Sequence, residues 1–323
     1  MFFLPFNIEA PDKKIHLKDP IITVGSCFSD EIGQKLKQYK FNITSNPFGT
    51  LYNLYSIFRN LRLILNEGLD LQNIVHHNEA FYHWDLHSSF TATTKEVLDQ
   101  RIQSESKQIK ETLLRARWLI ISPGTSFIYR LKSENRIVAN CHKIPQREFE
   151  KILLSKEEIV NTFSQTYRLL RSANPDLKFL FTISPVRHIR DGLIQNNLSK
   201  GILHQSVQEI LEHHADTFYF PSYEIMIDVL RDYRFYKEDM IHPNHQAIEF
   251  IWDKFRGTYI EESTLTFLEG WKEILKAINH KPFQPQSEAH QLFIRSTIKN
   301  IKKYSDKVDI SNELNVLEKQ LKS

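Results

Sequence analysis

The chain has 323 residues, of which 41% are hydrophobic and 25% are charged, and its net charge at pH 7 is +3. This length and composition allow one large domain or two modest ones with a sizeable buried core. The nearly balanced charge, without a dense basic run among aromatic residues, argues against a nucleic-acid-binding protein. Two cysteines, Cys27 and Cys141, are too few for a disulfide framework, so we expect reduced thiols.

No stretch has the length of a transmembrane helix, and we expect no membrane partner. The first six residues lack a basic region and include Pro5, so we do not predict a signal peptide. A cytoplasmic protein is the default expectation. Residues 1–20 contain Pro5, Pro11 and Pro20 and are predicted to form a lead-in arm.

The first informative stretch is residues 21–38. Four apolar or β-branched residues end at Gly25, a hydroxyl follows at Ser26, and Phe28, Ile32 and Leu36 then recur with helical spacing. This pattern predicts a strand, a sharp turn and a helix, with Ser26 at the carboxyl end of the strand, where open α/β sheets bind ligands. Two interpretations stay open: Ser26 is a nucleophile, or it is an ordinary helix N-cap.

Residues 41–94 predict a second short strand at 41–44, a turn at 46–50 and a helix over 51–66. Residues 81–87 alternate strictly, which predicts a strand. One face of this strand would carry Tyr82, Trp84 and Leu86. The opposite face would carry His83, Asp85 and His87. A metal bound by the second face is the less favoured interpretation, because same-face positions lie about 6.6 Å apart. There are two alternatives for this face. It contacts the substrate, with His87 near the pocket, or it is a plain face exposed to solvent.

The following part alternates strands with helices. We predict buried strands at 117–122, 178–184 and 217–220 and a hairpin from 127–130 and 136–140. We predict helices at 95–114, 146–172, 195–215, 224–232 and 245–256. This alternation favours a mostly parallel sheet of about five strands with helices on both faces. Residues 262–323 show almost no strand signal and are predicted to be a helical appendage.

The second informative stretch is Asp239-x-x-His242-Pro243, which precedes a predicted helix near the end of the α/β part. An imidazole can accept a proton from a serine at neutral pH, and a nearby carboxylate fixes its tautomer. Three residues of separation in a tight turn let Asp239 reach His242. The alternative is that Asp239 caps a turn and His242 is an ordinary surface residue.

Taken together, an early serine, a glycine loop and a late Asp-x-x-His resemble the SGNH (GDSL-type) hydrolases. The string Gly25-Ser26-Cys27-Phe28 resembles the motif of the GSCFA family, with Ser29 in place of its alanine. Three further stretches resemble the same family over about residues 5–260: 46–50 (NPFGT), 140–143 (NCHK) and 182–188 (TISPVRH). The resemblance implies an α/β/α flavodoxin-like fold with Ser26 as nucleophile, His242 as base and Asp239 as its orienter.

The resemblance also implies an oxyanion hole, which needs donors aimed at the developing negative charge. The backbone N–H groups of Ser26 or Cys27 and of Gly49 are candidates. SGNH enzymes add an Asn after the third strand, but the matching loop, which begins at Gly124, has none. Asn140, a little later, is the nearest candidate.

Several further residues are candidates for a site. Cys27 is a rival nucleophile, since a thiol at a helix N-terminus is more reactive, although we expect its side chain to turn inward to the core. His142, beside Asn140, could bind an anionic or sugar group. Arg187 and His188 follow a strand and could hold a substrate anion or hydroxyl. For each of these, a structural ion pair is the alternative.

The sequence therefore predicts a three-layer α/β/α SGNH-like (flavodoxin-like) domain over residues 1–260, with an insertion at about 70–145 and a helical appendage over 261–323. The expected function is a serine hydrolase or acyltransferase acting on an ester-linked acyl group of a small molecule or glycan, without a metal or nucleotide cofactor. The alternative is a non-catalytic carbohydrate- or partner-binding protein on the same fold. The oligomeric state is not predicted.

Overall fold

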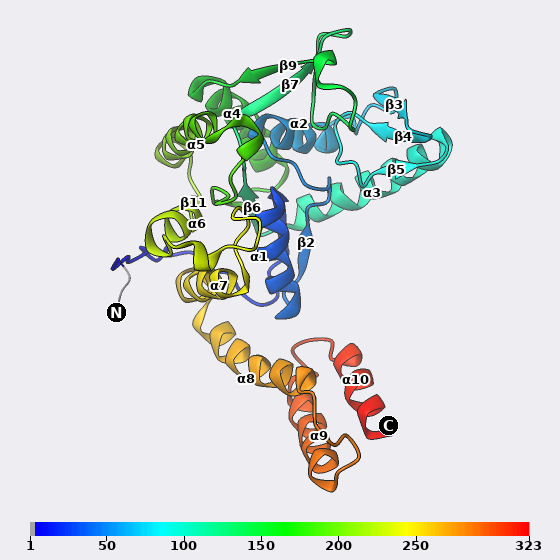
Figure 1. Cartoon of the computed structure of the whole chain (residues 1–323), viewed down its shortest axis with the longest axis vertical. Helices are drawn as coiled ribbons and strands as arrows, with labels where there is room; N and C mark the ends of the chain where they lie inside the picture. The colour runs from blue at the N-terminus through cyan, green and yellow to red at the C-terminus, as the bar shows by residue number, and fades with distance from the viewer. Residues whose placement is uncertain (1–3, 323) are drawn as a thin grey trace.

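The computed structural model describes residues 4–322, so residues 1–3 of the predicted arm lie outside the described residues. Its centre is a five-stranded parallel sheet (Figure 1). The strands are β1 (Ile21–Gly25), β2 (Ile43–Ser45), β6 (Trp118–Ser122), β10 (Lys178–Phe181) and β11 (Thr217–Tyr219), in the order β11-β10-β6-β1-β2. Counted along the chain, this order is 2-1-3-4-5, which is the flavodoxin-like order. The predicted fold class is confirmed.

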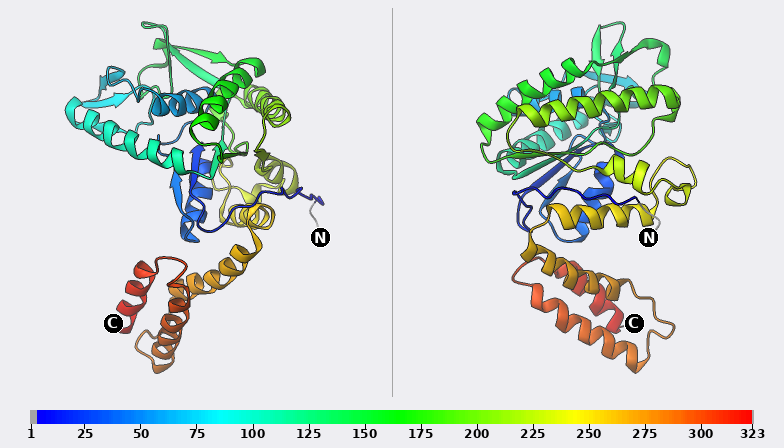
Figure 2. Two further views of the ribbon diagram at one scale, coloured as in Figure 1. Left: turned by 180° about the vertical axis from the view of Figure 1, so that it is seen from behind. Right: turned by 90° about the vertical axis from the view of Figure 1, so that its left-hand side faces the viewer.

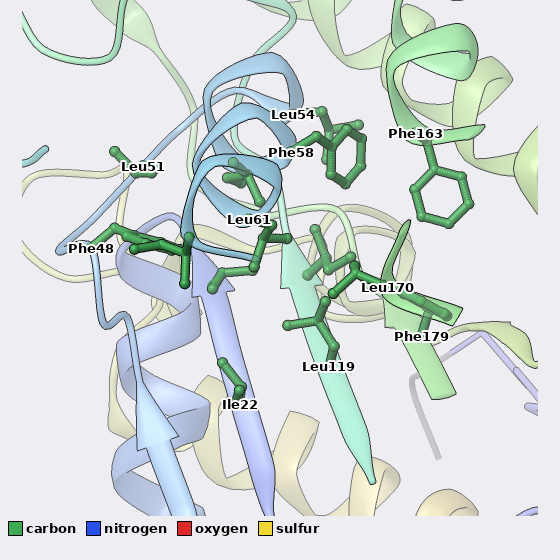
Figure 3. Close-up of a cluster of buried hydrophobic side chains, with 14 of the residues drawn as sticks. Ile22, Phe48, Leu51, Leu54, Phe58, Leu61, Leu119, Phe163, Leu170 and Phe179 are labelled. Carbon is green, nitrogen blue, oxygen red and sulfur yellow. The ribbon is translucent and has the colours of Figure 1, made fainter. Parts of the chain in front are cut away.

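The strands are apolar on both faces because helices cover both faces. Alternate residues point to opposite sides, so Ile22, Leu119 and Phe179 enter one core while Ile21, Ile120 and Leu180 enter the other. The first core packs against α2 (Leu54–Leu65), α3 (Lys95–Arg115), α4 (Lys156–Ala173) and α5 (Leu193–His213) (Figure 3). The second packs against α1 (Cys27–Gln38) and α7 (His245–Tyr259).

Two small antiparallel sheets lie to one side of the central sheet (Figure 2). One contains β3 (Ile74–His77), β4 (Ala80–His83) and β5 (Thr91–Ala92). The other contains β7 (Phe127–Leu131), β8 (Arg136–Val138) and β9 (Phe149–Leu153), with the predicted hairpin at β7 and β8.

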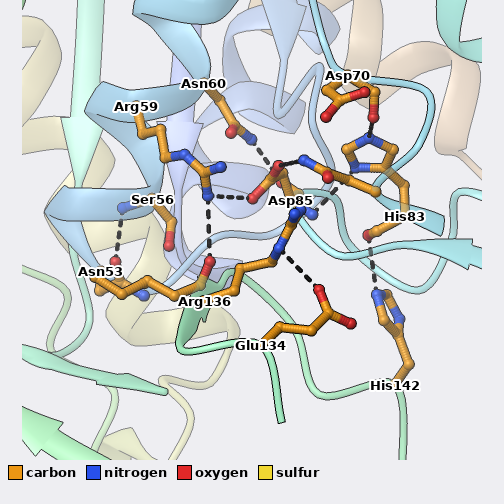
Figure 4. A network of polar contacts seen from close by, with 12 residues as sticks. Asn53, Ser56, Arg59, Asn60, Asp70, His83, Asp85, Glu134, Arg136 and His142 are labelled. Atoms are coloured by element: carbon orange, nitrogen blue, oxygen red, sulfur yellow. Dashed lines mark hydrogen bonds and ion pairs between the residues drawn. The ribbon is translucent and has the colours of Figure 1, made fainter. Parts of the chain in front are cut away.

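The strand predicted over 81–87 is wrong beyond residue 83. Strand β4 ends at His83, and the chain then turns so that Asp85 is buried. The Asp85 carboxylate accepts a hydrogen bond from Arg59 at 2.6 Å, and Asn60 donates to its carbonyl oxygen (Figure 4). The buried polar network overrides the alternating pattern, so His83, Asp85 and His87 do not share a strand face.

The helix predicted over 146–172 begins later than expected. Residues 146–148 form a 3₁₀ turn, and β9 then pairs with β7. Helix α4 starts after Ser155, whose hydroxyl accepts the N–H of Glu158 while the Glu158 carboxylate accepts the N–H of Ser155. This capping box is visible in the sequence as Ser-x-x-Glu, so the boundary was predictable.

The predicted helix at 224–232 is instead a short helix α6 (Ser222–Glu224) followed by a π-helical turn, Ile225–Val229. Further 3₁₀ turns lie at Ile189–Asp191, Tyr233–Phe235 and Lys302–Tyr304. No helix within residues 4–322 combines the length and the apolar character needed to cross a membrane.

The C-terminal part is helical, as expected, with α8 (Glu262–Asn279), α9 (Glu288–Ile301) and α10 (Ser311–Lys322) at one end of the molecule (Figure 1). These helices are tied to the end of α1 and to the residues that follow it. The Trp271 indole donates to the carbonyl oxygen of Gln38 at 3.0 Å, and Lys40 pairs with Glu313 at 2.8 Å. The division of the chain at residue 260 stays a prediction.

The turn after β1 requires a glycine. Gly25 has φ of +145°, and a Cβ there would lie 2.2 Å from the carbonyl oxygen of Ser122 on β6. Because that oxygen is backbone in the middle of the sheet, it cannot move aside without breaking the pairing of β1 with β6.

We expect Gly25→Ala to lower the free energy of unfolding by about 3 kcal/mol or more, through overpacking and backbone strain. Gly201→Ala is the matched control, because a Cβ there meets nothing within 4 Å and α5 should gain up to about 1 kcal/mol. Urea unfolding followed by circular dichroism measures both. Equal stability of Gly25→Ala and the wild type would contradict the close approach of β1 and β6.

Candidate active site

Ser26 is the residue at which β1 ends and α1 begins. Its hydroxyl accepts the N–H of Phe28 at 3.3 Å, so Ser26 does act as the N-cap. The same oxygen lies 3.5 Å from the hydroxyl oxygen of Ser122, which ends the neighbouring strand β6. Strands β1 and β6 are where the strand order reverses, and ligands of open α/β sheets bind at that point.

Asp239 and His242 form a hydrogen-bonded pair in the loop before α7. His242 Nδ1 lies 2.6 Å from Asp239 Oδ2, while Asp239 Oδ1 accepts the N–H groups of Ile241 and His242 at 2.9 Å each. The two backbone N–H groups, followed by the imidazole, lower the pKa of Asp239 to about 2. A carboxylate can only accept, so Nδ1 donates this hydrogen bond, and in the neutral imidazole Nε2 is then the acceptor.

Ser26 and His242 line the same cavity of about 480 Å³. Other hollows are larger, at about 600 and 700 Å³, but neither of these is lined by Ser26 or His242. Within residues 4–322, no hydrogen bond joins the Ser26 hydroxyl to His242, so the expected direct contact is not formed. Catalytic hydrogen bonds are often long without substrate and tighten in the complex.

Cys27 also lines this cavity and is half-buried. The expectation that its side chain turns into the core is therefore wrong. Burial, followed by the nearby Asp30 carboxylate, raises the pKa of the Cys27 thiol. These effects oppose the benefit that a helix N-terminus gives a thiolate, so they make Cys27 a weaker nucleophile.

The N–H of Gly49, which was considered for the oxyanion hole, and the N–H of Gly124 are both already engaged. Gly49 donates to the carbonyl oxygen of Asn46 at 2.7 Å, and Gly124 donates to that of Tyr52 at 2.7 Å. The N–H of Ser26 donates to the carbonyl oxygen of Ser122 at 2.8 Å. The N–H of Cys27 lies in the first turn of α1, where a helix offers it no internal partner.

Asn53 is a polar residue of the cavity that the sequence analysis missed. It is the N-cap of α2, and its Oδ1 accepts the N–H of Ser56 at 2.8 Å (Figure 4). This bond fixes the amide plane. Within residues 4–322, no hydrogen bond of the Nδ2 group is found, and Asn53 lines the cavity with Ser26. The sequence held only a cap signal here, because Asn before a helical run is common at N-caps.

Three predicted residues lie away from the cavity, in the insertion. Asn140 Oδ1 accepts the Ser88 hydroxyl and the N–H of His142, and His142 Nε2 lies 2.9 Å from the carbonyl oxygen of His83 (Figure 4). Burial lowers the pKa of His142 to about 4. His87 lies against Ser89 and packs on Gly49. These three residues brace the insertion, and none lines the cavity that holds Ser26.

Arg187 and His188 line the cavity, as the sequence suggested. Burial, followed by the charge of Lys200, lowers the pKa of His188 to about 4. Its Nε2 lies 2.9 Å from the point where a Gly124 Cβ would be, and the Ser26 Cβ lies 3.5 Å from that point. A neutral imidazole therefore lies close to Ser26, in space that the missing side chain of Gly124 leaves open.

Lys200 is fully buried near His188. Its ammonium donates to the carbonyl oxygen of Ser184 at 2.5 Å, and burial lowers its pKa to about 7. No cluster of three His, Cys, Asp or Glu side chains suited to a metal ion is found within the described residues.

Comparisons with known proteins identify relatives. A model described as the GSCFA family matches residues 20–255, and one described as "GSCFA domain protein, C-terminal domain" matches residues 271–323. No curated protein matches the chain.

Two solved structures are similar to the chain. One is a family two carbohydrate esterase from Clostridium thermocellum in complex with cellohexaose, with 11% identity, a TM-score of 0.35, and coverage of 80% of this chain and 67% of that one. The other is an acetyl xylan esterase from the rumen bacterium Butyrivibrio proteoclasticus, with 11% identity, a TM-score of 0.36, and coverage of 75% and 64%. Similarity at this level does not transfer an activity.

We expect the Asp239 carboxyl to titrate near pH 2, which ¹³C NMR of its side-chain carbon measures. His242→Ala removes only the ring contact, so the pKa should stay below 3.8 because the two backbone N–H groups remain. The lowered pKa of Asp239 contributes to the free energy of unfolding. This contribution is present above the unfolded-state pKa of Asp239 and is lost as the pH falls towards 2. It should be small, because the side chain is 43% exposed. A wild-type midpoint near 3.8 would contradict this geometry.

Proposed function

Because the chain belongs to the GSCFA family, we propose that it is a serine hydrolase or acyltransferase that acts on an ester-linked acyl group of a carbohydrate. The observation that carries the proposal is that Ser26 and His242, more than 200 residues apart, line one cavity at the switch point of the sheet, and that His242 is hydrogen-bonded to Asp239. A nucleophile, a base and an orienting carboxylate are the parts that acyl transfer through a covalent intermediate needs.

The proposed reaction has two halves. Ser26 Oγ attacks the acyl carbon while its proton passes to His242 Nε2, and the bond from the acyl carbon to the alcohol oxygen then breaks. The alcohol leaves with the proton from His242, and an acyl-Ser26 ester remains. In the second half, water or a sugar hydroxyl attacks the acyl carbon of this ester while its proton passes to His242 Nε2. The bond from the acyl carbon to Ser26 Oγ then breaks, and Ser26 takes the proton back from His242. Water gives hydrolysis, and a sugar hydroxyl gives transfer of the acyl group.

We assign the oxyanion hole to the N–H of Cys27 and the side-chain amide of Asn53. Both lie at helix N-termini, whose partial positive charge favours an oxyanion. The Asn53 amide is held in place by its capping bond, so binding an oxyanion requires little reorganisation. In this proposal Asn53 takes the place that the sequence analysis gave to Asn140.

A non-catalytic binding protein is the second candidate. It is favoured by one observation: the Ser26 hydroxyl already caps α1 and does not contact His242 in this structure. In that case the cavity would bind a glycan without turnover.

We expect Ser26→Ala to lower kcat for 4-nitrophenyl acetate by about 10³-fold or more, because the nucleophile is lost. Cys27→Ala is the matched control, since it removes the neighbouring thiol and keeps the backbone N–H, and it should retain most of the activity. Both are measured by release of 4-nitrophenol, with circular dichroism to check folding. Loss of turnover in Cys27→Ala and not in Ser26→Ala would reverse the assignment of the nucleophile.

We expect Asn53→Asp to lower kcat about 10²–10³-fold with little change in KM, because the oxyanion donor is lost. Aspartate preserves the cap, so the free energy of unfolding should be almost unchanged. Asn140→Asp is the control outside the cavity. Wild-type kcat in Asn53→Asp would show that Asn53 is only a cap.

A further inference from the structure

Two guanidinium groups at the cavity have no carboxylate partner. Arg187 and Arg190 both line it, and within residues 4–322 neither forms an ion pair within 4.0 Å. Arg190 also has no hydrogen bond to another described residue, and its side chain is exposed. The cavity therefore presents two guanidinium groups that form no ion pair with a described carboxylate.

Three acidic groups near the cavity have partners other than the two arginines. Asp30, whose charge acts on Cys27 and Tyr52, accepts hydrogen bonds from Asn46 and Thr50. Asp191, which follows Arg190 and lines the same cavity, is ion-paired with Lys151. Asp239 accepts three hydrogen bonds within its own turn, one from the N–H of Ile241 and two from the N–H and the ring of His242. None of these carboxylates forms an ion pair with Arg187 or Arg190, so both guanidinium groups are free to bind a negative ligand.

Arg187 is held in a defined position beside the catalytic loop. Its guanidinium lies 4.8 Å from the centre of the Tyr236 ring and 6.0 Å from that of Tyr233, and Nη1 lies 3.5 Å from the carbonyl oxygen of Met240. Met240 belongs to the turn that joins Asp239 to His242. A group bound by Arg187 would therefore lie next to the base.

We infer that the substrate is an anionic sugar ester, whose carboxylate or phosphate binds Arg187 and Arg190 while its ester reaches Ser26. Guanidinium groups recognise both anions through paired hydrogen bonds. Tyr52 and Tyr129 line the same cavity, so two aromatic side chains border the space that the sugar ring would occupy. This inference rests on the proposed function and names the substrate class of that site.

Three acetylated sugars test it: an O-acetylated methyl glucoside, the corresponding methyl glucuronoside and O-acetylated glucose 6-phosphate. They place a neutral group, a carboxylate or a phosphate on the same ring. The wild type should release acetate from one or both anionic esters with kcat/KM about tenfold higher or more than from the neutral ester. Equal or lower values for both anionic esters would overturn the inference.

Arg190→Gln removes one cation and should lower the anionic-to-neutral ratio of kcat/KM about tenfold. Arg231→Gln is the matched control, because Arg231 is also exposed but lies outside the cavity. It should leave the ratio unchanged. An unchanged ratio in Arg190→Gln would remove Arg190 from the recognition of the anion.

Calorimetric binding of unacetylated methyl glucuronoside, glucose 6-phosphate and methyl glucoside separates recognition from catalysis. Preference for an anionic sugar without any turnover would retain anion recognition and overturn the proposed hydrolase. Turnover without preference in either assay would leave the hydrolase and overturn anion recognition. If the protein showed no turnover and no preference for an anionic sugar, both the hydrolase and the anion recognition would be overturned.

Discussion

The candidate site depends on how closely β1 and β6 approach each other where they end. The N–H of Ser26 donates to the carbonyl oxygen of Ser122 at 2.8 Å, and Gly25 leaves no Cβ to separate the two strands. Asn46 reinforces the same point, because its Oδ1 accepts the N–H of Gly25 at 2.8 Å and its Nδ2 donates to Asp30. The Ser26 hydroxyl is thus positioned by backbone contacts of the sheet, which a ligand cannot easily displace.

The sequence predicted those features of the fold that arise from local periodicity. The strands at 21–25 and 118–122 are nearly continuous apolar runs, as buried parallel strands are, and the two strands pair in parallel. Residues 81–87 show where periodicity fails. There the strand ends at His83, and Asp85 instead pairs with Arg59. That contact joins α2 to the insertion, which one sequence alone does not reveal.

The candidate site was predictable only in part, for a similar reason. Asp239 and His242 are three residues apart, so their pairing could be inferred from a local turn. Asn53 and Asn140 could not be ranked in this way, since both are asparagines near predicted turns. Their difference lies in the packing: Asn53 caps α2 beside β1, whereas Asn140 is engaged with Ser88 and His142 in the insertion.

Two imidazoles line the cavity, and their surroundings suit them to different tasks. His188 is packed against Tyr52 and near the buried Lys200, so burial and a like charge lower its pKa to about 4 and it stays neutral at neutral pH. His242 is 40% exposed and faces a carboxylate that is ionised down to about pH 2. An imidazolium formed during acyl transfer is stabilised only where a carboxylate and water are both close. Of the two, His242 alone has a carboxylate within hydrogen-bond distance. The Asp191 charge favours protonation of His188, but burial and Lys200 outweigh it, so His188 can donate or accept a hydrogen bond but is unsuited to cycle a proton.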